Sequence, residues 1–173
     1  MLHHVSVGVS NIERAAKFYD AALGALGYWR VMEFPGAIAY GERNGEPQFW
    51  IGTPHNQNAA SAGNGSHIGF TAPTKSAVLK FHAAALEQGG SNNGEPGPRP
   101  DYGDNYYGAF VYDLDGNKIE ATLISAPVKK AKPKLKAKVK AKATKTPAKK
   151  AKAVAKKPVK TAAKKKKKKA RTR

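Results

Sequence analysis

The chain of 173 residues contains no cysteine, which excludes a disulfide framework and any thiolate metal site. It has no apolar run of the roughly 18–20 residues that a membrane-spanning helix needs. Its first residues, "MLHHVSVGVSNIER", lack the basic start and continuous apolar segment of a signal peptide. We therefore expect a cytoplasmic protein with no membrane partner, long enough for one ordinary domain with a hydrophobic core.

Acidic residues are absent from the C-terminal part of the chain. Residues 129–173 contain 23 Lys and Arg, no Asp or Glu and no aromatic residue, whereas residues 1–128 contain 8 basic and all 12 acidic residues. The formal net charges are therefore +23 and −4. A Lys/Ala/Pro-rich segment of this kind cannot bury enough apolar surface to offset the entropy of ordering, so residues 127–173 are predicted to be a disordered tail.

The composition of this tail resembles the lysine-rich tails of linker histones and of some bacterial nucleoid proteins. A long run of cations predicts non-specific, salt-sensitive binding to DNA or another polyanion, and with it association with the nucleoid. The tail has no aromatic side chain to stack on bases and only two arginines, Arg171 and Arg173, so it is not expected to discriminate between sequences. A solubilising extension without a partner is the alternative interpretation.

An internal repeat organises the rest of the chain. The segments "HVSVGV" (4–9) and "HIGFTA" (67–72) align at an offset of 63 residues, and so do "KFYDAALGALG" (17–27) and "KFHAAALEQGG" (80–90). One offset shared by two segments predicts two copies of one supersecondary unit.

Each copy is predicted to have the order βαβββ. Alternating valines give the first strand, "SNIE" (10–13) has the spacing of a capping box, and Gly27 is a plausible helix stop. Asp115–Gly116 is a hairpin-turn signal. Further strands are expected at about 28–34, 37–42, 47–52, 106–113 and 117–124, with residues 95–103 unassigned. The fold class is therefore α+β, with domain 1–126 built from modules at about 1–53 and 66–126, a linker at 54–65, and a curved, partly open mixed sheet.

Polar side chains recur on one face of three predicted strands. His4, His67 and Glu120 each alternate with apolar residues that pack on the helix side. Two imidazoles and one carboxylate that converge inside the sheet are predicted to bind a divalent metal (Fe, Mn, Zn or Ni) and to leave coordination positions open. His3 lies on the opposite face and is expected to be structural, and Trp50 stands at the position of Glu120 in the first copy.

Candidate catalytic residues cluster around the turn-rich segment "GEPGPRPDY" (94–102). An arginine can clamp a carboxylate or phosphate, and a tyrosine can donate a proton. We select Arg99, Tyr102 and Tyr107 as candidates, with ordinary surface or core roles as the alternative.

The paired βαβββ modules, the histidines of their first strands and the segment "DLDGNKIEATL" resemble the vicinal oxygen chelate superfamily, which includes glyoxalase I, fosfomycin and bleomycin resistance proteins and extradiol dioxygenases. The resemblance covers about residues 1–126. It implies metal ligands at His4, His67 and Glu120, and metal-assisted chemistry on a small substrate with two adjacent oxygens. Glyoxalase I has a fourth, carboxylate ligand where this chain has Trp50, which argues against lactoylglutathione lyase activity. The modules of this superfamily can pair within or between chains, so a homodimer is expected as one possibility.

Three classes of function remain open from the sequence. The first is a metalloenzyme whose reaction class (lyase, transferase or oxidoreductase) is undetermined. The second is a metal-independent protein of the bleomycin-resistance kind that binds a small molecule. The third is a nucleoid-associated protein in which the tail is the functional part.

Overall fold

The structure is a computed structural model that describes residues 2–125 of the chain. The predicted tail, and any polyanion contact that it makes, lies outside the described residues. Within these residues, neither helix is long and apolar enough to cross a membrane.

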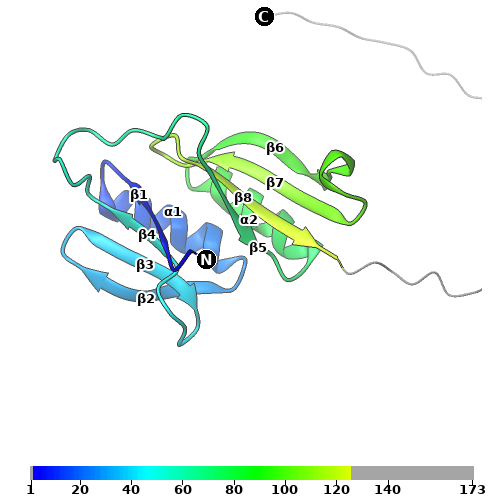
Figure 1. Cartoon of the computed structure of the whole chain (residues 1–173), viewed down its shortest axis with the longest axis horizontal. Coiled ribbons are helices and arrows are strands. Elements are labelled where there is room, and N and C mark those ends of the chain that lie inside the picture. The colour runs from blue at the N-terminus through cyan, green and yellow to red at the C-terminus, as the bar shows by residue number, and fades with distance from the viewer. Residues whose placement is uncertain (1, 126–173) are drawn as a thin grey trace, which may run out of the picture. The chain divides into compact units, whose positions relative to one another are not determined.

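Both copies of the repeat fold as βαβββ modules, as predicted (Figure 1). The first module consists of β1 (Val5–Gly8), α1 (Ile12–Gly24), β2 (Tyr28–Phe34), β3 (Ala37–Glu42) and β4 (Phe49–Gly52). The second consists of β5 (His67–Thr71), α2 (Lys75–Glu87), β6 (Ser91–Pro98), a 3₁₀ turn (Pro100–Tyr102), β7 (Tyr106–Tyr112) and β8 (Lys118–Ile124). The segment left unassigned from the sequence therefore contains the end of β6 and the 3₁₀ turn.

Each module forms its own four-stranded mixed sheet. The strand orders are β1-β4-β3-β2 and β5-β8-β7-β6. The first strand of each sheet runs parallel to the last strand of its module, and the remaining neighbours are antiparallel. No strand pairing joins the two sheets within residues 2–125, so the expectation of one continuous sheet is corrected to two. The edge strands β1 and β5 belong to different modules, and each pairs only with its own sheet.

Both helices begin at a side-chain cap that the sequence supplies locally. The Asn11 side chain accepts a hydrogen bond from the backbone N–H of Arg14, and Thr74 does the same for Ala77. These caps satisfy backbone donors that have no partner inside the helix. Gly27, just beyond α1, has a φ of 92°, a conformation that favours glycine after a helix and agrees with its predicted role as a stop.

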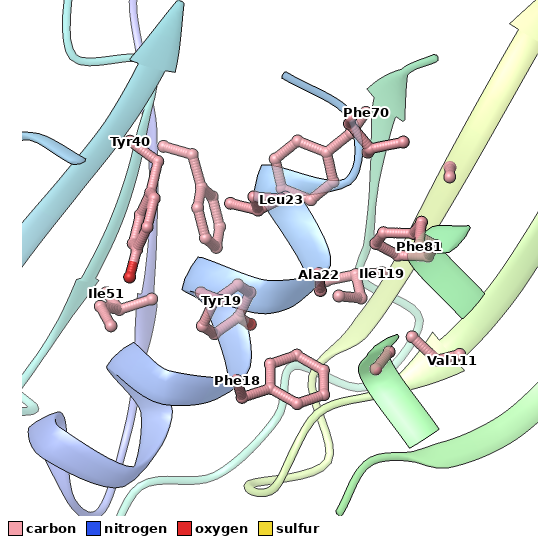
Figure 2. Packing of buried hydrophobic residues seen from close by; sticks show 14 of the residues in the cluster. Phe18, Tyr19, Ala22, Leu23, Tyr40, Ile51, Phe70, Phe81, Val111 and Ile119 are labelled. Carbon is pink, nitrogen blue, oxygen red and sulfur yellow. The ribbon is translucent and has the colours of Figure 1, made fainter. Parts of the chain in front are cut away.

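One hydrophobic core runs through both modules. Figure 2 shows α1 between two sets of buried side chains, with Tyr40 and Ile51 on one side and Phe81, Val111 and Ile119 on the other. Every second residue of β3, β4, β7 and β8 packs in or against this core. The opposite face of each sheet, which we call its open face, carries the residues in between, and neither helix of residues 2–125 packs on it.

A buried polar cluster joins the end of the second module to the first. Tyr19 of α1 donates a hydrogen bond to Asp113 Oδ2 (2.7 Å), and Asn117 Nδ2 donates to the carbonyl of Gly8 (3.2 Å). Asp113 and Asn117 are 6% and 7% exposed. Because their polar groups are paired with one another and with the first module, the cluster fixes the β7–β8 turn against β1.

Candidate functional site

The strand registers place Trp50 and Glu120 at equivalent positions of the two modules. Trp50 of β4 lies opposite Ser6 of β1, and Glu120 of β8 lies opposite Gly69 of β5. Ser6 and Gly69 are 63 residues apart, the offset of the repeat. The residues on either side of Trp50 and Glu120 are buried in the core, so both side chains project onto open faces, as the alternation predicts.

Glu120 and His67 form a close pair on the open face of the second sheet. Glu120 Oε2 lies 3.2 Å from His67 Nε2. The Glu120 side chain is 3% exposed, whereas that of His67 is 45% exposed. The sheet therefore holds a nearly buried carboxylate beside an accessible imidazole.

The second oxygen of Glu120 is held by a tyrosine that the sequence analysis did not select. Tyr106 donates a hydrogen bond to Glu120 Oε1 over 2.5 Å. Burial, and then this hydrogen bond, raise the pKa of Tyr106 above its ordinary value. The phenol is therefore protonated at neutral pH, and it fixes the orientation of the carboxylate beside His67.

Tyr107, selected as a catalytic candidate, lies on the core side of β7 and not on the open face. It packs against the hydrophobic core, and the ammonium of Lys75 from α2 lies 5.1 Å from its ring centroid. Neighbouring strand residues face opposite ways, so only one of the adjacent tyrosines can reach the open face. The alternation of Ala109 and Val111 into the core could have identified Tyr106 from the sequence.

The other two catalytic candidates do lie on the open face of the second sheet. The Tyr102 side chain is 63% exposed, and its ring lies edge-on to that of Tyr106 at 5.2 Å. The guanidinium carbon of Arg99 lies 5.4 Å from the ring centroid of Phe110. The ring centroid of Phe110 is in turn 6.2 Å from that of His67. Tyr102 is thus linked to Glu120 through Tyr106, and Arg99 is linked to His67 through Phe110.

His4 lies in the other module and does not join this pair. It precedes β1, is exposed, and shares a hollow of about 360 Å³ with Trp50 and His55. Its Nδ1 is 2.9 Å from Nδ1 of His3, which is also exposed. Among residues 2–125 there is no group of three His, Asp or Glu side chains that could hold a metal ion. One copy of the chain therefore does not assemble the predicted three-residue site, because its imidazoles stand on separate sheets.

The chemistry of the His67–Glu120 pair nevertheless fits part of a metal site. A carboxylate oxygen and an imidazole nitrogen are ligands of first-row divalent metals. Protein metal sites of this kind use three or more protein ligands. The second module alone therefore supplies two donors and lacks at least one.

Comparison with models of protein families shows to which family the chain belongs. A model described as the Glyoxalase/Bleomycin resistance protein/Dioxygenase superfamily matches residues 1–121. The chain belongs to this superfamily. The resemblance that the first-strand histidines and "DLDGNKIEATL" indicated is thus confirmed for this part of the chain, while residues 122–173 lie outside the match.

Solved structures of the superfamily agree with this assignment. A glyoxalase/bleomycin resistance protein from Albidiferax ferrireducens T118 is 40% identical, with a TM-score of 0.65 over 71% of this chain and 98% of that one. A glyoxalase-related enzyme from Fulvimarina pelagi (18% identity, TM-score 0.56, 71% and 87% covered) shares the fold. So does a family enzyme from Burkholderia phytofirmans PsJN (17%, 0.55, 71% and 98%). A search of curated proteins finds no match.

The superfamily sets the range of chemistry for this site. It includes enzymes, and its members commonly bind divalent metals and small-molecule substrates and often form dimers. The pair on the open face of the second sheet is the part of this chain that fits such chemistry.

Proposed function

We propose that this chain is a divalent-metal-dependent enzyme of the glyoxalase/bleomycin resistance/dioxygenase superfamily that acts on a small substrate with two adjacent oxygens. The observation that carries the proposal is the His67–Glu120 pair, in which two atoms of the kinds that bind divalent metals lie 3.2 Å apart on a face that neither α1 nor α2 covers. When bound there, a divalent metal would act as a Lewis acid toward the substrate oxygens.

The chain's own residues would divide the work around that metal. Glu120 Oε2 and His67 Nε2 would be ligands. Tyr106 holds Glu120 Oε1 and so keeps the carboxylate turned toward His67, as partners of ligating carboxylates do. The Tyr106 hydroxyl, protonated because its pKa is raised, is also the nearest candidate for moving a proton at the site.

We further propose that His4 of a second copy of the chain supplies the missing ligand. His4 lies beside Trp50 on the open face of the first sheet, which carries the exposed side chains of Met32 (40%) and Phe34 (55%). Exposed apolar surface of this kind favours burial against a partner. Superfamily members often form dimers, and pairing the open face of one copy with that of another would bring His4 to a His67–Glu120 pair.

Mixed dimers test this arrangement. His4→Ala and Glu120→Ala each remove one ligand, so we expect neither variant alone to retain metal. When the two are co-expressed with different tags and the doubly tagged species is isolated, a site shared between copies restores one intact set of ligands. Elemental analysis should then find about one metal per mixed dimer. A mixed dimer without metal, beside a wild type that contains it, would exclude His4 of the second copy. A Glu120→Ala homodimer that keeps full metal would exclude the metal site itself and favour a metal-independent binding protein.

For the basic tail we propose non-specific binding of DNA or another polyanion. The support is the sequence alone: 23 positive and no negative charges in residues 129–173. Deletion of these residues should leave metal content unchanged and abolish retention on DNA–cellulose at low salt. Retention of the wild type should fall steeply between about 50 and 200 mM salt, as counterion release requires. Equal retention of both proteins would exclude the tail as the cause.

A further inference from the structure

We propose that the open face of the second sheet binds an anionic substrate. The binding site is cationic and consists of Arg99 and Lys118, whose charged groups both lie near the ring of Phe110. This inference rests on the proposed function, because the site adjoins the His67–Glu120 pair. It adds the substrate class: a small molecule that carries a carboxylate, phosphate or phosphonate group in addition to its two adjacent oxygens.

Arg99 is held in a prepared position. Its Nη2 donates a hydrogen bond to the carbonyl of Glu95 (2.6 Å) and its Nη1 to that of Pro98 (3.3 Å). Two glycines make room for it, since a Cβ at Gly94 or Gly97 would lie 3.3 Å from a guanidinium nitrogen. A guanidinium fixed by backbone carbonyls keeps N–H donors free to meet two oxygens of a carboxylate or phosphate group.

Lys118 approaches the same ring from the neighbouring strand. It lies on β8 two residues before Glu120, on the same face, and is paired in register with His67 of β5. Its ammonium nitrogen is 5.1 Å from the centroid of Phe110, and the Arg99 guanidinium carbon is 5.4 Å from it. Phe110 is only 6% exposed, so its ring is a rigid surface that holds both cations by cation–π contacts.

Neither cation has a carboxylate partner among residues 2–125. The five ion pairs found there involve other cations. Glu95, the acidic residue nearest to Arg99 in the β6 strand, turns its carboxylate toward Asn92 and His82. Asp101 and Asp104 are exposed in the following loop and form no ion pair with Arg99. Both cations are half-buried.

Unpaired, half-buried positive charge is unusual in this domain, whose net charge over residues 1–128 is −4. Two such charges beside one ring create a local positive potential that a bound divalent metal would increase. An anion placed there would accept charge-assisted hydrogen bonds from Arg99 and an ion pair from Lys118. The chemistry therefore selects an anionic substrate over a neutral one.

Inorganic phosphate is a suitable probe, titrated at constant ionic strength into the full-length protein as isolated. Backbone amide chemical-shift changes of Gly94, Gly97 and Lys118 in NMR spectra report binding at the site. They do not report phosphate that binds to the tail. Arg99→Gln and Lys118→Gln should each weaken this binding by about ten- to a hundredfold, the loss expected for a charge-assisted contact.

Lys75→Gln is the matched control. Lys75 also lies 5.1 Å from an aromatic ring of β7, that of Tyr107, but on the helix side of the sheet. The Lys75→Gln substitution should therefore leave the amide shift changes caused by phosphate the same as in the wild type. Shifts that are equally strong in the wild type and in both site variants would overturn the inference, as would an equal loss in Lys75→Gln.

Metal content of the same samples separates this inference from the proposed function. Arg99→Gln and Lys118→Gln leave His67 and Glu120 intact, so they should retain metal while they lose phosphate. Metal retention with an unaltered phosphate response would overturn only the anion site. If the wild type holds no metal, but its phosphate response is lost in both variants, only the metal site is overturned. The single variants each replace one half-buried side chain, and a preserved NMR spectrum verifies that they fold.

Discussion

The two modules share a topology and a core but carry opposite chemistry on their open faces. In the first module, Trp50 stacks on Phe34 with ring centroids 6.1 Å apart and an interplanar angle of 7°. At the equivalent place in the second module, Glu120 pairs with His67. The core side of a duplicated sheet must fill the same volume in both copies, whereas the open side is free of that requirement and can diverge. One face is therefore suited to burial against a partner, and the other to a polar ligand.

The hairpin turns of the two modules differ in the same way. The turn hydrogen bond from Gly45 N to Glu42 O in the first module corresponds to the bond from Gly116 N to Asp113 O in the second. Glu42 is exposed, but Asp113 is buried and accepts hydrogen bonds from Asn117 and Tyr19. Equivalent acidic residues thus have a solvent role in one module and a structural role in the other.

The largest expected difference between the modules concerns metal binding. Glu120→Gln removes the anionic ligand while it preserves shape, so we expect the protein to lose stoichiometric metal. Trp50→Phe at the equivalent position should leave the metal content unchanged. Elemental analysis after gel filtration measures both, and metal loss in Trp50→Phe alone would reverse the assignment of the modules.

The shared core should show equal effects in both modules. Phe18 of α1 and Phe81 of α2 are equivalent in the repeat and both fully buried. Their replacement by alanine should lower the free energy of unfolding by about 3–5 kcal/mol each, since each leaves a cavity in one continuous core. Phe34→Ala, on the open face, removes no side chain from this core and should cost less than either core variant. Urea denaturation tests this, and a large effect in only one helix would mean that the modules unfold separately.

The turns should differ in their effect on stability. Asp113→Ala leaves the Tyr19 hydroxyl and the Asn117 amide without their buried acceptor, so we expect a loss of about 2–3 kcal/mol. Glu42→Ala should stay within about 0.5 kcal/mol. Thermal denaturation of the two variants under one set of conditions gives the comparison, and equal melting temperatures would show that the buried cluster does not hold the modules together.

The smallest effect concerns alkaline pH. Burial and a neighbouring carboxylate raise the pKa of Tyr40 in the first module (beside Asp20) and of Tyr106 in the second (beside Glu120). A raised pKa in the folded state means that stability is fully present below pH 10, the ordinary value, and is lost as the pH rises above it. Tyr40→Phe should remove more of this alkaline loss than Tyr106→Phe, because Tyr40 is fully buried. Denaturation curves between pH 8 and about 11 measure the loss of unfolding free energy in the wild type and in each variant. A larger reduction of this loss in Tyr106→Phe than in Tyr40→Phe would contradict the prediction.

Much of the architecture could be predicted from local signals. The alternation around Glu120 and the constant offset of the repeat depend on neighbouring residues in the chain, and both agree with the structure. The capping box at 10–13 predicts the start of the first helix to within one residue, since the cap is Asn11 rather than Ser10. The second strand of the second module, β6, was not located from the sequence because "SNNGEPGP" is rich in glycine, asparagine and proline, which are depleted in strands. It forms there because β7 offers a partner edge.

The sequence by itself determined which residues face away from the core, since side-chain direction in a strand follows from alternation alone. That sufficed to place His67 and Glu120 on open faces, and, applied strictly, it would have chosen Tyr106 over Tyr107. Only the tertiary structure decided which of these residues meet. His67 and Glu120 come together because β5 pairs with β8, and His4 remains apart because β1 pairs with β4 in another sheet. Strand pairing is a long-range choice among edges, and neither periodicity nor spacing specifies it.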